Sequence, residues 1–331
     1  MQGIKYDTLF NIDSHTPIPL LQNYLLEKEW ITPEEHIQST EKPGEGNMNV
    51  VLRIRTNTRS FILKQSRPYV QKYQQIAAPL ERIEVERDFY ETVKSSALNA
   101  HIPKILGYDA ETFVMILEDL GHCEDMTLMY AKKSFSKKAL EKLVFILGLI
   151  HKKKVPADFP KNLEMRYLNH QHIFVLPFLE DNGFQLDDVQ PGLQELSMSY
   201  KKDTGLKTLV DHIGKIYLSE GHTLIHGDYY PGSWMTEGNN LYVIDPEFGF
   251  VGFAEFDLGV MVAHLILATH KPDYMDTILE KYEGKADRRL VSQVAGIEIM
   301  RRLIGLAQLP LVRSIEEKEY LLQMAHKMIL V

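Results

Sequence analysis

One segment, residues 223–257, constrains the fold and chemistry of this chain more than any other part of its sequence. Three of its acidic residues, Asp228, Asp245 and Glu247, lie at or just beyond the ends of short apolar runs. One such carboxylate can orient a hydroxyl group and accept its proton, and two more can hold Mg²⁺ against phosphate oxygens. The order of these acids therefore indicates a phosphoryl-transfer site; the alternative is that they are ordinary loop residues that cap strands.

The apolar runs beside these acids predict two short strands, Thr223–Ile225 and Leu241–Ile244. A turn signal, Glu237–Asn240, lies between them. The simplest interpretation is that the two runs pair as one hairpin. Such a hairpin would deliver the carboxylates at one of its ends.

An upstream segment, Lys42–Asn49, has the composition of a phosphate-binding loop. Gly44 and Gly46, with the small polar residues Asn47 and Asn49, would let backbone N–H groups approach phosphate oxygens. A plain hairpin turn would explain the same composition.

Lys64 lies in the second of two predicted strands, residues 50–55 and 60–65. A nucleotide-binding kinase needs a Gly-rich loop followed by a cation on its third strand, and Lys64 would supply that cation. The same scheme requires a helix that carries a carboxylate partner. Residues 80–93 predict such a helix, with Glu86 on its apolar face. A glutamate on a solvated stripe is the alternative.

A five-residue apolar run, Phe113–Leu117, predicts a buried strand that leads into Glu118 and Leu120. In a kinase of two lobes, this would be the linker whose backbone binds adenine. A core strand that ends in a turn is the alternative.

The pattern of the chain changes after Leu120, and this change divides it into two regions. Residues 1–120 predict a small antiparallel sheet, and residues 121–331 predict a larger, mostly α-helical region. The fold class is therefore α+β with two lobes, as in protein kinases. Six of the expected helices are Gln190–Tyr200, Thr204–Ser219, Phe256–Thr269, Pro272–Tyr282, Ala286–Leu309 and Ile315–Ile329.

Arg301 falls on an apolar stripe, between Ile297 and Ile304, and Arg302 follows it. A guanidinium inside an apolar stripe needs an anion or a hydrogen-bond partner, whereas solvent-facing arginines are the alternative. Four histidines with apolar neighbours are expected to be hydrogen-bonded core residues rather than ligands: His151, His170, His172 and His264.

Composition excludes several other classes of protein. The net charge is −8, from 37 basic and 45 acidic residues, which argues against a broad nucleic-acid surface. The single cysteine, Cys123, suits a reducing compartment, and the longest apolar run, Leu258–Ala268, is too short to span a bilayer. We therefore expect a cytoplasmic protein with a small-molecule substrate and without a nucleic-acid or membrane partner; a homodimer stays open.

These pieces together resemble the aminoglycoside phosphotransferase and choline kinase group of small-molecule kinases, and within it the methylthioribose kinase family. The segments that carry the resemblance are spread over most of the chain. They are PGEGNMNVVLRI at 43–54, ILKQSRPYV at 62–70, ILEDL at 116–120, LNHQHIF at 168–174, HGDYYPGS at 226–233, DPEFGFVGFAEFDLG at 245–259 and GIEIMRRLIGLA at 296–307.

The resemblance implies ATP and Mg²⁺ as cofactors. Lys64, paired with Glu86, would hold the α- and β-phosphates, and Asp245 and Glu247 would bind Mg²⁺. The other residues that would contact nucleotide lie in the loop and the linker: Gly44, Gly46, Asn47, Asn49, Glu118 and Leu120.

On the acceptor side, the resemblance implies that Asp228 is the catalytic base and that Arg301 and Arg302 close over the acceptor or phosphate. Tyr229 and Ser233 are the other expected acceptor contacts. The implied activity is phosphorylation of a small-molecule hydroxyl, most closely 5-methylthioribose to its 1-phosphate in methionine salvage. A kinase of another sugar, an amino alcohol, choline or an aminoglycoside is the alternative. A nucleotide-binding pseudokinase that regulates a partner is the alternative from another class.

Two departures from the methylthioribose kinase pattern concern the acceptor. Residues 66–79 contain tyrosines but no tryptophan, and Tyr229-Tyr230-Pro231 stands where that family usually has Leu-His-Thr. Neither departure affects the residues expected to transfer the phosphoryl group.

Overall fold

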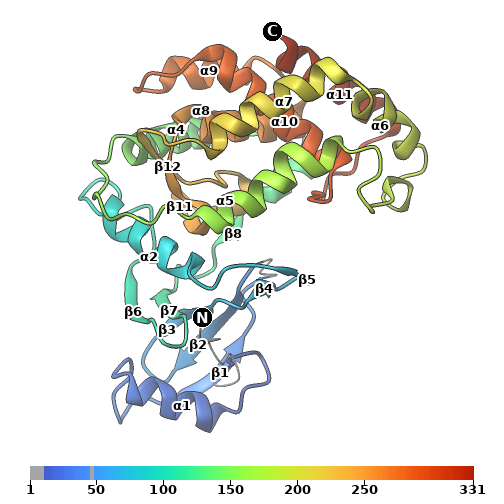
Figure 1. Cartoon of the computed structure of the whole chain (residues 1–331). Helices are drawn as coiled ribbons and strands as arrows, with labels where there is room; N and C mark the ends of the chain where they lie inside the picture. The colour runs from blue at the N-terminus through green and yellow to red at the C-terminus, as the bar shows by residue number, and fades with distance from the viewer. Residues whose placement is uncertain (1–10, 45–47) are drawn as a thin grey trace.

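The computed structural model describes residues 11–44 and 48–331, so Gly46 and Asn47 of the candidate phosphate loop lie outside the described residues. The elements form a small lobe built on a sheet and a larger helical lobe (Figure 1). The predicted α+β architecture with two lobes is therefore confirmed. The exact boundary after residue 120 stays a prediction.

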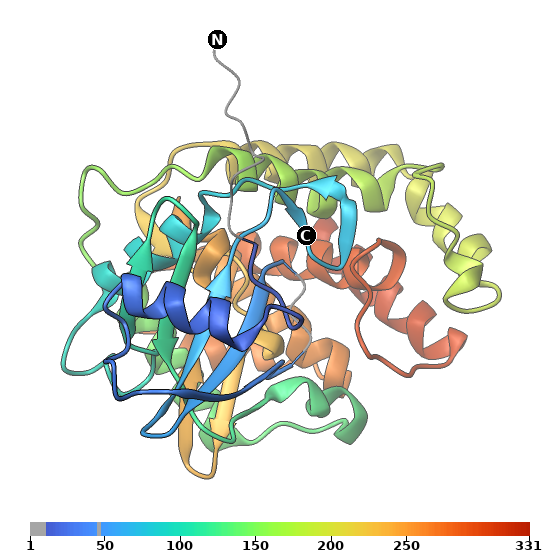
Figure 2. The same cartoon turned by 90° about the horizontal axis from the view of Figure 1, so that it is seen from below.

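Five antiparallel strands form the main sheet of the small lobe, in the order β1–β2–β3–β7–β6. One face packs under helix α1, Ile18–Glu27, which lies across the sheet in Figure 2. Every second residue of β2 is buried and points to this face, as the alternation of its apolar residues predicts. The strands are β1 Ile37–Glu41, β2 Val50–Thr56, β3 Ser60–Gln65, β6 Ile105–Asp109 and β7 Val114–Glu118.

Helix α2, Arg82–Val93, lies between the sheet and the large lobe (Figure 1). It begins two residues later than predicted, and Glu86 on its apolar face is fully buried. A short hairpin of β4, Tyr69–Val70, and β5, Tyr73–Ala77, precedes it. The tryptophan-free segment of the sequence therefore forms this hairpin.

The large lobe is organised around α8, which is buried on nearly all sides and packs against α10. A helix that is apolar all round belongs in the interior, and α8 carries almost no charge beyond its first turn. The helices of this lobe are α3 Met129–Lys132, α4 Lys137–His151, α5 Leu163–His170, α6 Leu193–Lys201, α7 Thr204–Leu218, α8 Ala254–Thr269, α9 Tyr274–Lys281, α10 Arg288–Ile304 and α11 Ile315–Leu330.

The six predicted late helices are all present, but the one predicted over 286–309 is too long. It ends at Ile304, because Gly305 adopts an extended conformation and Gln308 donates to the Gly305 carbonyl at 2.6 Å. The chain after Gly305 is thereby released from the helix and lines the main cavity described below. In the described part of the chain, no helix is long and apolar enough to cross a membrane.

The prediction that the two apolar runs of residues 223–257 form one hairpin is wrong. Strand β9, Thr223–Ile225, pairs with β12, Phe250–Gly252, which follows the acidic residues. The predicted turn instead joins β11, Asn240–Val243, to β10, Trp234–Glu237, and β8, Glu124–Asp125, adds to β10. Three- and four-residue strands carry too little periodicity to reveal their partners, so only the tertiary structure decides this pairing.

Candidate active site

Lys64 joins the two lobes through a buried cluster of charges. Its Nζ donates to both carboxylate oxygens of Glu86, at 2.8 and 2.7 Å, and to Oδ1 of Asp245 at 2.5 Å. Burial alone would lower the pKa of Lys64, but Asp245, Glu86 and Glu247 together raise it above its usual value. The ammonium group therefore stays charged at the end of β3, facing Asp245 of the large lobe.

A cavity of about 480 Å³ lies between the sheet and residues 232–245 of the large lobe. Lys64 is at one end of it, and Gly44, Glu118 and Leu120 of the nucleotide-binding prediction line its walls. Its apolar lining residues are of the kind that would enclose a flat, neutral ring: Val51, Ile62, Leu117, Leu120, Met235 and Ile244.

Asp245 lines both this cavity and a second, neighbouring one, whereas Glu247 lines only the second. Asp245 occupies the left-handed region, with φ 63°, a sparsely populated conformation for a residue other than glycine. Its side chain is 45% exposed, whereas Glu247 is buried, accepts from Asn49 Nδ2 at 2.9 Å and forms an ion pair with Arg82 at 3.3 Å. Asn49 therefore supports the Glu247 carboxylate, and it also lines the second cavity.

These two carboxylates fit a magnesium ion that is shared with phosphates. No group of three or more His, Cys, Asp or Glu side chains within residues 11–44 and 48–331 is arranged to hold a metal by itself. Mg²⁺ is usually held by one or two carboxylates plus substrate phosphates and water, so a complete protein cage is not required.

Asp228 is fixed by its own loop and by a buried residue behind it. The carboxylate of Asp257 accepts from the backbone N–H of His226 at 2.7 Å and of Gly227 at 3.0 Å. Gly227 has φ +81°, and a Cβ there would meet the Phe248 carbonyl oxygen at 2.2 Å, so only glycine fits. Asp257 was not assigned a role from the sequence.

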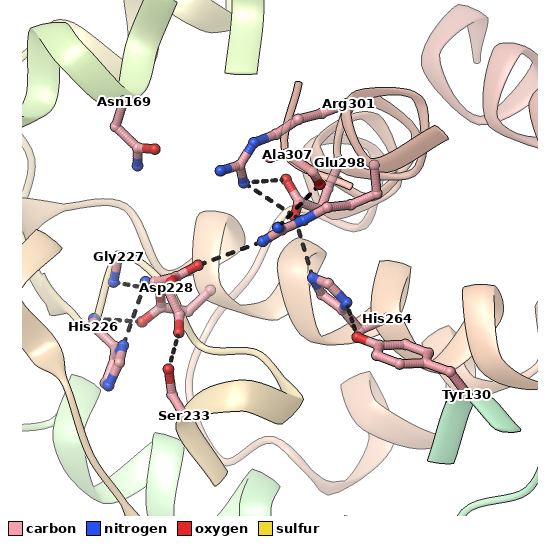
Figure 3. Close-up of polar contacts among 12 residues, drawn as sticks. Tyr130, Asn169, His226, Gly227, Asp228, Ser233, His264, Glu298, Arg301 and Ala307 are labelled. Atoms are coloured by element: carbon pink, nitrogen blue, oxygen red, sulfur yellow. Dashed lines mark hydrogen bonds and ion pairs between the residues drawn. The ribbon is translucent and has the colours of Figure 1, made fainter. Parts of the chain in front are cut away.

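The carboxylate of Asp228 is 26% exposed and faces two guanidinium groups (Figure 3). Arg302 Nη2 lies 3.7 Å from Asp228 Oδ1. Burial raises the pKa of Asp228 to about 6, although Arg302 and Arg301 act in the opposite direction. Ser233 is buried and donates to the Asp228 carbonyl at 3.0 Å, so it supports the loop from below.

Glu298 holds both arginines, and the sequence interpretation missed it. Arg302 Nε donates to its carboxylate at 2.6 Å, and Arg301 Nη1 donates to both of its oxygens at 2.9 and 3.1 Å. His264 lies 3.2 Å from the same carboxylate and is hydrogen-bonded in turn to the Tyr130 hydroxyl at 2.6 Å (Figure 3). The spacing of Glu298 three and four residues before the arginines is the signal that could have revealed it.

The candidate aromatic contacts are distributed differently from the prediction. Tyr229 is fully buried, and its hydroxyl donates to the Leu143 carbonyl at 2.8 Å, so it does not line the cavity. The next residue, Tyr230, does line it, and the guanidinium of Arg302 lies 5.1 Å from its ring centroid. The structure thus places Tyr230, and not Tyr229, in the wall of the cavity.

The main cavity, of about 550 Å³, brings these groups together. It opens from Lys64 and Asp245 to Asp228, and the β4–β5 hairpin contributes to its wall. Residues from α5, from the turn after it and from the chain after α10 complete the lining: Leu168, Asn169, His172, Leu306, Ala307, Gln308, Leu309 and Pro310.

A two-lobed fold with a buried Lys–Glu pair, paired carboxylates and a loop aspartate in one cavity defines the class of a kinase-like phosphotransferase. Residues 39–292 match the Phosphotransferase enzyme family, and the chain belongs to that family.

Among curated proteins, the chain is similar to methylthioribose kinases. It is 27% identical over 249 residues to that of Exiguobacterium sibiricum, covering 71% of this chain and 62% of that protein. It is 28% identical over 251 residues to that of Yersinia pseudotuberculosis, covering 72% and 61%. These matches span less than two thirds of each relative's length. The match to the Geobacillus protein is longer, with 26% identity over 342 residues, 88% of this chain and 84% of the relative.

Solved structures with the same fold include choline kinase LicA from Streptococcus pneumoniae, with a TM-score of 0.53 and 16% identity over 94% of this chain and 99% of that one. Plasmodium vivax ethanolamine kinase has a TM-score of 0.54 and 12% identity over 95% and 88%. At these identities the likeness shows the fold alone.

Proposed function

We propose that this protein is an ATP-dependent kinase of a neutral sugar, and that its acceptor is 5-methylthioribose, phosphorylated at the anomeric hydroxyl. The observation that carries the proposal is the single cavity that contains Lys64, Asp245, Asp228 and two guanidinium groups. The similarity to methylthioribose kinases supports the choice of acceptor.

The charged groups divide into a donor side and an acceptor side. On the donor side, Lys64 places a fixed positive charge where the phosphates of ATP would lie, and Glu86 holds its ammonium group in place. Asp245 and Glu247 would hold Mg²⁺, which when bound supplies positive charge to the phosphates. Asp245 would then exchange its contact with Lys64 for the metal.

On the acceptor side, Asp228 accepts the proton of the attacking hydroxyl. With its pKa at about 6, the carboxylate is mostly ionised at neutral pH yet more basic than an ordinary aspartate. The hydroxyl oxygen attacks the γ-phosphorus as its proton passes to Asp228, and ADP leaves. Arg302 beside Asp228 can donate to an acceptor hydroxyl or to the transferred phosphoryl group.

The same geometry disfavours a cationic acceptor such as choline or an aminoglycoside. Binding of a quaternary ammonium needs an open aromatic face or several free acids. Tyr229 and Trp234 are fully buried, and the face of Tyr230 is already occupied by Arg302. An amine would also meet the positive charges of Arg301 and Arg302 in the same cavity.

An ADP-release assay with a panel of acceptors tests the proposal. We expect release with 5-methylthioribose and little release with choline, ethanolamine or kanamycin. Release with an amine but not with any sugar would assign the protein to the alternative group of kinases. Tight ATP binding without ADP release for every acceptor would instead support the pseudokinase alternative.

A further inference from the structure

The wall of the main cavity opposite the arginines carries a polar side chain that the phosphoryl-transfer scheme does not use. Asn169 lies in α5, two residues before a π-helical segment, Gln171–Val175, and it lines the cavity although only 6% of its surface is exposed. Insertions of π-helix into an α-helix are frequent at functional sites, because they redirect side chains.

The Asn169 amide is held rigidly on one side and free on the other. Its Nδ2 donates to the hydroxyl of Tyr217 at 3.1 Å, and Tyr217 is itself fully buried. Its Oδ1 accepts no hydrogen bond from the described part of the chain, and this oxygen keeps some exposure to the cavity that Asn169 lines. This oxygen and the second amide hydrogen are therefore available to a ligand in the cavity.

Arg301 faces Asn169 across open space, with the carboxylate of Asp228 completing a triangle (Figure 3). Glu298 fixes the guanidinium through Nη1 alone, and the buried Nε has no partner in the described residues. His172 lies on the same wall as Asn169, and burial together with the charge of Arg301 lowers its pKa, so its imidazole is neutral.

We infer that Asn169 and Arg301 form a second hydroxyl-binding subsite, which holds a pair of neighbouring hydroxyls of the acceptor other than the one that is phosphorylated. This inference rests on the proposed function and specifies the class of acceptor as a vicinal diol. An amide supplies one acceptor and one donor, and a guanidinium supplies donors in a plane, so together they match the lone pairs and hydrogens of two adjacent hydroxyls.

The subsite also explains how an uncharged sugar can be oriented in the cavity. A sugar without charge has no strong electrostatic anchor, so hydrogen bonds to its other hydroxyls must align the reacting one with Asp228. A site built to bind a hydroxyl rejects an analogue that lacks it, because its buried polar groups are then left unpaired. Removing the matching hydroxyl should therefore cost turnover, not only affinity.

The test compares 5-methylthioribose with its 2-deoxy and 3-deoxy analogues, in the full-length protein and in two variants. Asn169→Ala removes the proposed contact, and Gln171→Ala removes an exposed amide two residues away as a matched control. For the wild type and the control we expect kcat/KM to fall about tenfold or more for at least one deoxy analogue, the value of one or two hydrogen bonds. In Asn169→Ala, turnover of the parent sugar should fall by the same factor, and the preference over that analogue should disappear.

A purely structural role for Asn169 would give another result. The variant would then lose turnover of the parent sugar and of both analogues equally, and that outcome would overturn the subsite. Wild-type protein that phosphorylates 5-methylthioribose without discriminating against either analogue would also overturn it, while leaving the proposed function intact. Absence of turnover with every sugar would overturn both. If Asn169→Ala fails to fold, Tyr217→Phe, which removes only the hydroxyl that anchors the amide, should weaken the same preference.

Discussion

The guanidinium of Arg302 lies 3.7 Å from the carboxylate of Asp228 and is held there by Glu298, whose Oε1 is 2.6 Å from Arg302 Nε. The proposed base is therefore buried enough for its pKa to rise, while a fixed positive charge keeps that rise in check. This balance sets the pH range in which Asp228 is ionised and can accept the proton of the acceptor hydroxyl.

Activity should therefore depend on pH through Asp228. The carboxylate must be ionised to accept a proton, and its pKa is about 6, so we expect kcat/KM to fall as the pH drops through about 6. Arg302→Gln removes a charge that lowers this pKa, so the acidic limb of the profile should move to higher pH. Arg288→Gln, an exposed arginine on the same helix, is the control and should leave the limb in place. If the acidic limb of the pH profile stays in place in Arg302→Gln, the ionisation that controls activity is not that of Asp228.

The effect of Mg²⁺ on ATP binding should depend on Asp245. In the absence of ligand its carboxylate binds Lys64, so Asp245→Asn removes a metal ligand and frees the lysine at the same time. We expect the gain in ATP affinity on adding Mg²⁺ to fall at least about tenfold, since even outer-shell partners of a metal are worth that much. ATP binding in the presence of EDTA should be kept or strengthened. Calorimetry with Mg²⁺ and with EDTA measures both affinities. Asp88→Asn, which changes a carboxylate away from the site, is the control. An undiminished effect of Mg²⁺ in Asp245→Asn would contradict the assignment.

Glu298 should act as a positioning residue for both arginines. Glu298→Gln keeps its shape but removes the charge that pairs with two guanidinium groups, so stability should fall by about 3 kcal/mol, the lower range for a broken buried ion pair. Acceptor kcat/KM should fall more than ATP affinity, because the arginines lie on the acceptor side. Thermal unfolding and steady-state kinetics check the two effects. An equal loss of ATP and acceptor binding would indicate general unfolding instead.

The loop that carries Asp228 should not tolerate a side chain at residue 227. Gly227→Ala would place a Cβ 2.2 Å from the Phe248 carbonyl oxygen and force an alanine into positive φ, so we expect a destabilisation of about 2 kcal/mol or more. Gly238 also has positive φ, at +58°, but its Cβ would meet nothing within 4 Å. Gly238→Ala should therefore cost only about 1 kcal/mol. Similar unfolding temperatures for the two variants would show that the close contact with Phe248 does not matter.

Part of this site could be predicted from sequence because local periodicity determines it. The position of Lys64 in a strand and of Glu86 on the apolar face of a helix follow from periods of two and 3.6 residues, and the two side chains do meet. Glu298 obeys the same helical rule relative to Arg301 and Arg302, so its role was also available from spacing.

The rest depends on long-range contacts. Strand β9 pairs with a strand that follows Glu247, and three residues of apolar sequence do not specify that partner. Tyr229 and Tyr230 are neighbours in a loop, so no period distinguishes the one in the core from the one in the cavity. Their orientation depends on the conformation of this loop, which Asp257 holds from α8 and which Gly227 permits through its positive φ.

Direct detection of a phosphorylated sugar tests the central claim most simply. Wild-type protein and Asp228→Asn are incubated with Mg²⁺, ATP and 5-methylthioribose, and the formation of sugar phosphate is followed by ³¹P NMR. We predict a new sugar phosphate with the wild type and formation at least about 100-fold slower with Asp228→Asn, the scale of lost general-base catalysis, while ATP binding by calorimetry is retained. No sugar phosphate from the wild type, under conditions in which choline or kanamycin is phosphorylated, would contradict the account, as would equal rates in the two proteins.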